Sequence, residues 1–184
     1  MSLFDLNTTN PITRELNMLA LPDSYEIELQ SDNLLFDIEN IEIKQRQLIV
    51  FTSEKGFDLI DLLTLLLKKI GSCNVTISTY AISELAIRRL FILRQKNLIT
   101  NLVFLLDKRN VVHKEAALNF LKQFADDVIL ADNHSKVTVL QNENYNLSIV
   151  SSMNYTRNPR IESGVIISSQ ATANFNKEWI TKTR

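Results

Sequence analysis

Residues 74–107 read NVTISTYAISELAIRRLFILRQKNLITNLVFLLD, and this stretch decides the fold class. Its two ends, residues 74–81 and 101–107, are short, apolar and rich in the side chains that strands favour. Between them, residues 83–97 have the length and apolar spacing of a helix, with Ser83 as its N-cap. A strand, a helix and a strand in this order predict a right-handed crossover between parallel strands.

The same rhythm extends in both directions along the chain. Residues 56–71 predict a helix that ends at Gly71, residues 113–125 a further helix, and residues 127–131 a further strand. Alternating helices and short apolar strands predict an α/β fold with a mostly parallel sheet flanked by helices.

Towards the end of the chain the pattern changes. Residues 136–141 and 147–152 predict two strands, and the polar five-residue link between them predicts a hairpin. A polar loop, a strand at 165–168 and a last helix at 170–183 follow. We therefore expect a mixed sheet in which antiparallel strands are added to the parallel ones.

The N-terminal quarter gives a weaker signal. Alternation within residues 25–29, 34–43 and 47–51 predicts strands of a half-buried sheet, after an irregular arm at 1–24. With 184 residues, of which 45% are hydrophobic, the chain fits one domain. We expect residues 1–46, the arm and first strands, to belong to the same domain as residues 47–184.

Composition excludes several classes of protein. The net charge of −1 excludes a strongly basic nucleic-acid-coating protein, so any anion site must be local. The single cysteine, Cys73, cannot form an intramolecular disulfide, and we expect a structural role for it in a reducing, cytoplasmic compartment. No signal peptide is evident, and the most apolar run, residues 59–70, is interrupted by Asp61, so no membrane insertion is expected.

Chemistry concentrates around the predicted hairpin. His134 and Lys136 are two residues apart at the start of its first strand, so alternation places both on one face. Asn154 follows the second strand, and Glu162 comes after a loop that carries Arg157 and Arg160. An ammonium and an amide can bind the oxygens of a phosphodiester, while a neutral imidazole can attack its phosphorus without a metal or other cofactor.

The string HSKVTVLQNENYNLSIVSSMNYTRNPRIE, residues 134–162, resembles the phospholipase D superfamily. That family carries HxKxxxxD, then GSxN, then an acidic residue, and here HSK, SSMN and Glu162 stand in the same order. The likeness extends from about residue 48 to the C-terminus. The family's aspartate falls at Gln141 and its glycine at Ser151.

The resemblance implies a role for each matching residue. His134 would be the nucleophile that forms a phosphohistidine, and Lys136 and Asn154 would hold the phosphate with support from Ser152. Glu162 would orient His134. Single-motif members of this family form homodimers that bring two motifs together, and the other histidine, His113, has no lysine two residues later. We therefore expect an isologous dimer with one composite site.

The residues around the motif favour a nucleic-acid substrate over a lipid and do not choose between DNA and RNA. Single-motif members are often nucleases, and Arg157 and Arg160 are suited to the phosphates of DNA or RNA. Tyr155 could stack on a base or pack beneath the loop. A lipid substrate is disfavoured because no basic amphipathic helix is evident. The alternative is a degenerate member that binds nucleic acid or a protein without cleaving, and a protein partner that supplies specificity is compatible with either.

Overall fold

The computed structural model describes residues 26–31, 38–53, 58–111, 115–157 and 160–183. Its strands are β1 Glu26–Ser31, β2 Gln47–Ser53, β3 Cys73–Thr79, β4 Ile99–Asp107, β5 Asp127–Ala131, β6 Val137–Gln141, β7 Asn146–Ser151 and β8 Glu162–Ser168. Its helices are α2 Leu59–Ile70, α3 Glu84–Gln95, α4 Lys108–Val111, α5 Glu115–Phe124 and α6 Gln170–Lys182. His113, predicted within the helix of residues 113–125, lies outside the described residues.

All eight strands form one sheet in the order β1-β2-β8-β7-β6-β3-β4-β5. Parallel pairing joins β1 to β2, β3 to β4 and β4 to β5. The remaining neighbours, from β2 through β8, β7 and β6 to β3, are antiparallel. The predicted α/β fold with a mixed sheet and a β6–β7 hairpin is confirmed. The expectation that the sheet is mostly parallel is wrong, because three of these pairs are parallel and four are antiparallel.

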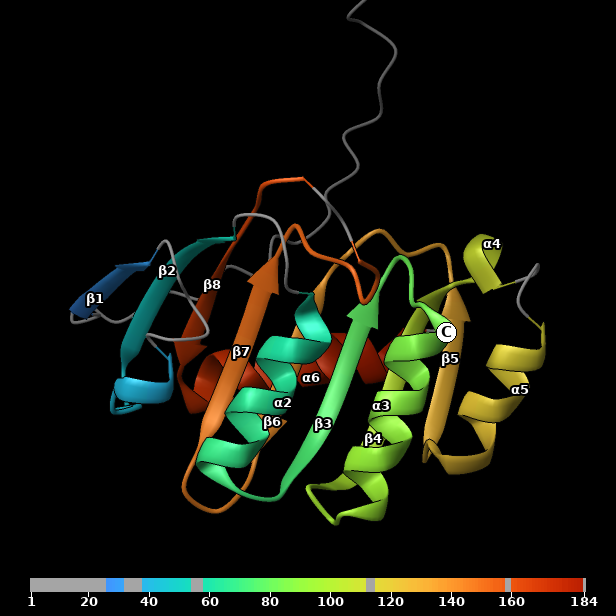
Figure 1. The fold of residues 1–184 in the computed structure, drawn as a ribbon, viewed down its shortest axis with the longest axis horizontal. Helices are drawn as coiled ribbons and strands as arrows, with labels where there is room; N and C mark the ends of the chain where they lie inside the picture. Colours follow the sequence, from blue (N-terminus) through green and yellow to red (C-terminus); the bar gives the residue numbers. More distant parts are fainter. Residues whose placement is uncertain (1–25, 32–37, 54–57, 112–114, 158–159, 184) are drawn as a thin grey trace, which may run out of the picture.

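Helices cover the two faces of the sheet unequally. Helices α2, α3 and α5 lie on one face, and α6 lies on the other behind β6 and β7 (Figure 1). The strand period of two separates two apolar clusters, so that Phe104 packs towards α2 and α3 while its neighbour Leu105 packs with Ala173 and Ile180 of α6. The sheet is therefore the middle layer of a three-layer molecule.

Local signals in the sequence fix the helix ends. Asp58 caps α2 through a capping box with Asp61, and Gly71 ends that helix in the left-handed region at φ 86°. Ser83 caps α3 as predicted by accepting the backbone N–H of Ala86. Helices α2 and α3 therefore begin at the edge of the sheet where β3 and β4 end.

The predicted strand at residues 34–43 is wrong for the part of it that the structure describes. Within the predicted strand at residues 34–43, residues 38–40 form a helical turn, and residues 34–37 lie outside the described ranges. Ile38 and Ile43 are both buried, and the side chain of Gln47 bonds to the backbone of Lys44 and of Glu42. The alternating apolar residues thus come from a bend closed by an amide side chain.

The lone cysteine lies in the hydrophobic core. Cys73 is fully buried, and burial raises the pKa of its thiol to about 11 even though Asn142 donates to the sulfur. This is consistent with a structural role.

In the described ranges, no helix has both the length and the apolar character needed to cross a bilayer.

Candidate active site

The predicted site residues gather at one edge of the sheet. Strands β3, β4, β5 and β7 end at this edge, and β6 and β8 begin there (Figure 1). Three connections therefore meet, namely residues 80–83 after β3, residues 132–136 before β6 and residues 152–155 after β7. In α/β folds this edge, where parallel strands end, is the usual place for a ligand.

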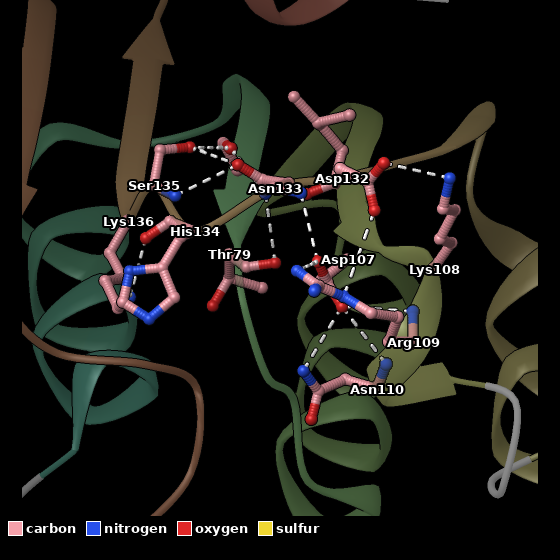
Figure 2. Close-up of polar contacts among 12 residues, drawn as sticks. Thr79, Asp107, Lys108, Arg109, Asn110, Asp132, Asn133, His134, Ser135 and Lys136 are labelled. Carbon is pink, nitrogen blue, oxygen red and sulfur yellow. Dashed lines mark hydrogen bonds and ion pairs between the residues drawn. The ribbon is translucent and has the colours of Figure 1, made fainter. Parts of the chain in front are cut away.

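His134 and Lys136 precede β6 rather than belonging to it, and they nevertheless face each other. Nζ of Lys136 lies 3.3 Å from Nδ1 of His134 and donates to the His134 carbonyl at 2.7 Å (Figure 2). The backbone N–H of Ser151 donates to the Lys136 carbonyl at 3.2 Å, which joins this segment to β7. The two predicted catalytic groups are therefore adjacent, as expected.

A tyrosine that sequence reasoning missed completes this group. Tyr80, immediately after β3, packs its ring against the imidazole of His134 with 4.6 Å between ring centroids. The ammonium of Lys136 lies 5.3 Å from the same tyrosine ring. Its position at the end of a parallel strand was the only sequence signal that could have indicated Tyr80.

The contact between Lys136 and His134 has a consequence for the imidazole. An ammonium group only donates hydrogen bonds, so this contact favours the tautomer of the neutral ring in which Nδ1 accepts and Nε2 carries the proton. Burial lowers the pKa of Lys136, and the nearby charge of Glu162 opposes that change. A nucleophilic Nε2 requires the other tautomer, in which Nδ1 carries the proton.

Asn154 has a fixed orientation. Its Oδ1 accepts the backbone N–H of Ala81 at 3.1 Å and lies 3.4 Å from the hydroxyl of Thr79. Because the Ala81 N–H can only donate, the atom facing it must be the amide oxygen. Within the described ranges Nδ2 has no hydrogen-bond partner, so this donor is available to a ligand.

Ser152 and Glu162 lie together at the adjoining ends of β7 and β8. The hydroxyl of Ser152 donates to Oε2 of Glu162 and accepts the backbone N–H of Ser163 at 3.0 Å. Glu162 is also close enough to Lys136 for its negative charge to raise the pKa of that lysine. Glu162 therefore acts electrostatically on Lys136, and its predicted bond to His134 stays a prediction.

Tyr155 lies in the core of the protein, where its ring cannot stack on a base. Its side chain is fully buried, and its hydroxyl lies 2.8 Å from that of Thr138. Its backbone N–H donates to the carbonyl of Ala81, and its carbonyl accepts from Ser83. Stacking of Tyr155 on a base is therefore wrong for this structure, because the ring packs beneath the loop.

The two arginines of the loop are exposed. Arg157 and Arg160 flank residues 158–159, which lie outside the described ranges. Their exposure suits contact with an anionic substrate, and their assignment to substrate binding stays a prediction.

Both departures from the family motif have a structural context. Gln141 lies at the far end of β6, roughly 17 Å along the strand from Lys136, where its amide bonds to Asn146 and Asn174. Ser151 has no positive φ and pairs with Gly164 on β8. A Cβ at Gly164 would lie 2.6 Å from Cβ of Ser151. The close approach of β7 and β8 at this point thus requires the glycine at position 164.

A network of buried polar groups beside His134 was also missed from the sequence. Asp107 and Asn133 bond to each other and to the ends of β3 and β4 (Figure 2). Among the residues that the structure describes, no group of three or more His, Cys, Asp or Glu side chains could hold a metal ion.

Comparison with known proteins adds a distant likeness. The sequence matches no protein-family model, and no curated protein matches it. Among solved structures, it is similar to TrmBL2, described as an archaeal chromatin protein with a novel mode of DNA binding, with 14% identity and a TM-score of 0.47. The match covers 81% of this chain and 55% of that one, so the chain spans about half the length of TrmBL2. A likeness this distant assigns neither family nor function.

Proposed function

We propose that this chain is a metal-independent phosphodiesterase of the phospholipase D type that cleaves DNA or RNA, with His134 as its nucleophile. One observation carries the proposal. The loop after β3 contacts both halves of the motif, since Tyr80 packs on His134 and Ala81 holds the oxygen of Asn154. An imidazole, an ammonium and an amide donor therefore face the same edge of the sheet.

In the proposed reaction, Lys136 and Nδ2 of Asn154 bind the non-bridging oxygens of the phosphodiester. Nε2 of His134 attacks phosphorus, the bond to the leaving oxygen breaks, and a phosphohistidine forms. Water then attacks phosphorus, the P–N bond breaks, and the phosphomonoester leaves.

Substrate binding must also change the state of His134. Phosphate competes for the ammonium that now lies beside Nδ1. Once Lys136 turns to the phosphate, Nδ1 can carry the proton and Nε2 becomes the nucleophile. In this proposal Glu162, whose charge acts on Lys136, is the carboxylate that stabilises the resulting imidazolium.

The leaving oxygen needs a proton in the first step, and an attacking His134 cannot supply it. We infer that His134 of the partner subunit does so in a homodimer, and that it then deprotonates the water of the second step. The exposed position of His134 and the absence of a described partner for Nε2 are compatible with a site completed by a second chain. The buried, lone Cys73 fits a cytoplasmic location.

The test is hydrolysis of bis(p-nitrophenyl) phosphate, single-stranded DNA and RNA in excess EDTA by the wild type and by His134→Asn. We expect turnover by the wild type only, with both proteins showing the same circular dichroism. Equal turnover by His134→Asn, or complete loss of wild-type turnover on chelation, would contradict the proposal.

A second function is favoured by one observation, the 3.3 Å contact between Nζ of Lys136 and Nδ1 of His134, which favours the tautomer with the proton on Nε2. If Lys136 stays beside Nδ1 when an anion binds, the chain is a non-cleaving family relative that binds nucleic acid or a protein partner. Filter binding of labelled oligonucleotides separates the two, because a binder retains them uncut in the wild type. A partner protein that supplies sequence specificity is compatible with both functions.

A further inference from the structure

The segment that carries His134 and Lys136 has no regular secondary structure, although its position is tightly determined. Residues 132–136 connect β5 to β6 across the ends of β4 and β3. Asp132 and His134 are exposed, whereas Asn133 between them is 7% exposed. The chain therefore inserts one amide side chain into the sheet edge immediately before the proposed nucleophile.

Asn133 uses all of its side-chain polar atoms within the protein. Its Nδ2 lies within donating distance of three acceptors, the hydroxyl of Ser78 at 3.0 Å and the carbonyls of Thr79 and Leu105 at 3.2 Å. Its Oδ1 accepts the backbone N–H of Ser135 at 3.0 Å and the Ser135 hydroxyl at 2.6 Å. Residues on both sides of His134 are thus fixed to the ends of β3 and β4.

Asp107, the last residue of β4, also binds the segment of residues 132–136, through the backbone of Asn133. Its buried carboxylate accepts the backbone N–H groups of Asn133 at 3.0 Å, Arg109 at 3.0 Å and Asn110 at 3.3 Å. Burial alone would raise the pKa of Asp107, but the bonds from Arg109 and Asn133 outweigh it and hold the pKa at about 2. The group is therefore an anion at neutral pH.

We propose that Asp107 and Asn133 are positioning residues that hold the backbone of His134 beside Lys136 (Figure 2). Held in this way, the His134 ring packs on Tyr80 and its Nδ1 lies next to the ammonium of Lys136. Neither side chain needs to touch the substrate. The catalytic part of this inference rests on the proposed phosphodiesterase function, whereas the effect on the imidazole does not depend on it.

Two residues at the other edge of the sheet provide matched controls. Asn142 makes the same kind of amide bonds, to the carbonyls of Ile70 and Ser72 and from the N–H groups of Asn144 and Tyr145. Asp126 accepts a backbone N–H, that of Leu102, and pairs with Arg94, much as Asp107 does with Asn133 and Arg109. Both lie far from His134 along the strands, so their loss tests stability without positioning.

The experiment compares Asn133→Asp and Asp107→Asn with Asn142→Asp and Asp126→Asn. The ring signals of the two histidines are recorded by nitrogen-15 NMR and assigned with His134→Asn, and kcat and KM are measured at a temperature where each variant is folded. We expect the first pair to shift or broaden the His134 signals and to lower kcat roughly 10- to 100-fold with little change in KM. The control pair should leave both unchanged.

Ser135→Ala provides a milder variant in case the first pair fails to fold. It removes only the hydroxyl contacts with Asn133 and Ser78 and should cause a smaller change in the same direction. Folded variants whose His134 signals and kcat equal those of the wild type would overturn the inference. If the wild type has no turnover, the proposed function fails, and the His134 signals alone decide on positioning.

Discussion

The backbone N–H of Ala81 donates a 3.1 Å hydrogen bond to Oδ1 of Asn154, which joins the loop after β3 to the loop after β7. Asn154→Asp keeps an acceptor for that N–H but replaces the free Nδ2 donor with a carboxylate oxygen. We therefore expect this variant to fold with nearly wild-type thermal stability and to lose at least about 10-fold in kcat/KM. Wild-type hydrolysis of bis(p-nitrophenyl) phosphate by Asn154→Asp would contradict the role of Nδ2.

The contact between Lys136 and Nδ1 of His134 predicts a change of tautomer on anion binding. Inorganic vanadate, which imitates the five-coordinate phosphate, should draw the ammonium away and move the ring proton from Nε2 to Nδ1. Nitrogen-15 NMR of the wild type measures this change, with His113 as internal control. Lys136→Met should lack the initial preference for Nε2. An unchanged His134 spectrum at saturating vanadate would speak for the non-cleaving alternative.

The buried carboxylate of Asp107 predicts an acid-dependent loss of stability. Its pKa is about 2 in the folded protein, below the value of about 4 in an unfolded chain. The ionised group therefore stabilises the fold at all pH values above about 4, and this contribution is lost as the pH falls from about 4 to about 2. In Asp107→Asn, the free energy of unfolding measured with urea should fall less steeply over that interval. An identical slope in both proteins would refute this linkage.

The close approach of β7 and β8 predicts that Gly164 tolerates no side chain. A Cβ there would lie 2.6 Å from both Phe51 Cζ and Ser151 Cβ. We expect Gly164→Ala to cost about 1–3 kcal/mol in urea unfolding. Adding Ser151→Gly should recover part of this loss because it removes one of the close contacts, and a double-mutant cycle measures the coupling. Strictly additive effects would contradict the predicted clash.

The composite site predicts a dimer at working concentrations. Light scattering coupled to gel filtration should give about twice the chain mass at micromolar concentration. His134→Asn should form the same dimer, since that substitution changes an exposed side chain and leaves the buried core unchanged. A monomer that retains full turnover would show that the proton for the leaving group comes from elsewhere in the chain.

Much of this arrangement was predictable because it depends on local patterns. The helix ends at Ser83 and Gly71, the crossover strands and the β6–β7 hairpin follow from caps, apolar periods and turn composition. The meeting of Lys136 with His134 followed from their spacing, although both precede the strand. Residues 38–40 misled the prediction because alternating apolar residues also arise in a bend with two buried isoleucines.

The rest of the site depends on contacts between distant parts of the chain. Helices α4 and α5 and strand β5 separate Asp107 from Asn133 in the chain, and no spacing rule links the two residues before the sheet order is known. Tyr80 and Tyr155 are both aromatic residues in loops, yet one lies beside His134 and the other is buried against Thr138. Composition could not distinguish them, because the difference arises from pairing of the loops after β3 and β7.

The nucleophilic role proposed for His134 is tested by trapping the covalent intermediate. The wild type is mixed with a phosphorus-32-labelled oligonucleotide in EDTA, quenched in alkali within one turnover, and compared with His134→Asn. We expect a labelled adduct on wild-type His134 that survives alkali and is released by acid, and none on the variant. Cleavage of the oligonucleotide without any such adduct, or equal labelling of both proteins, would contradict that role.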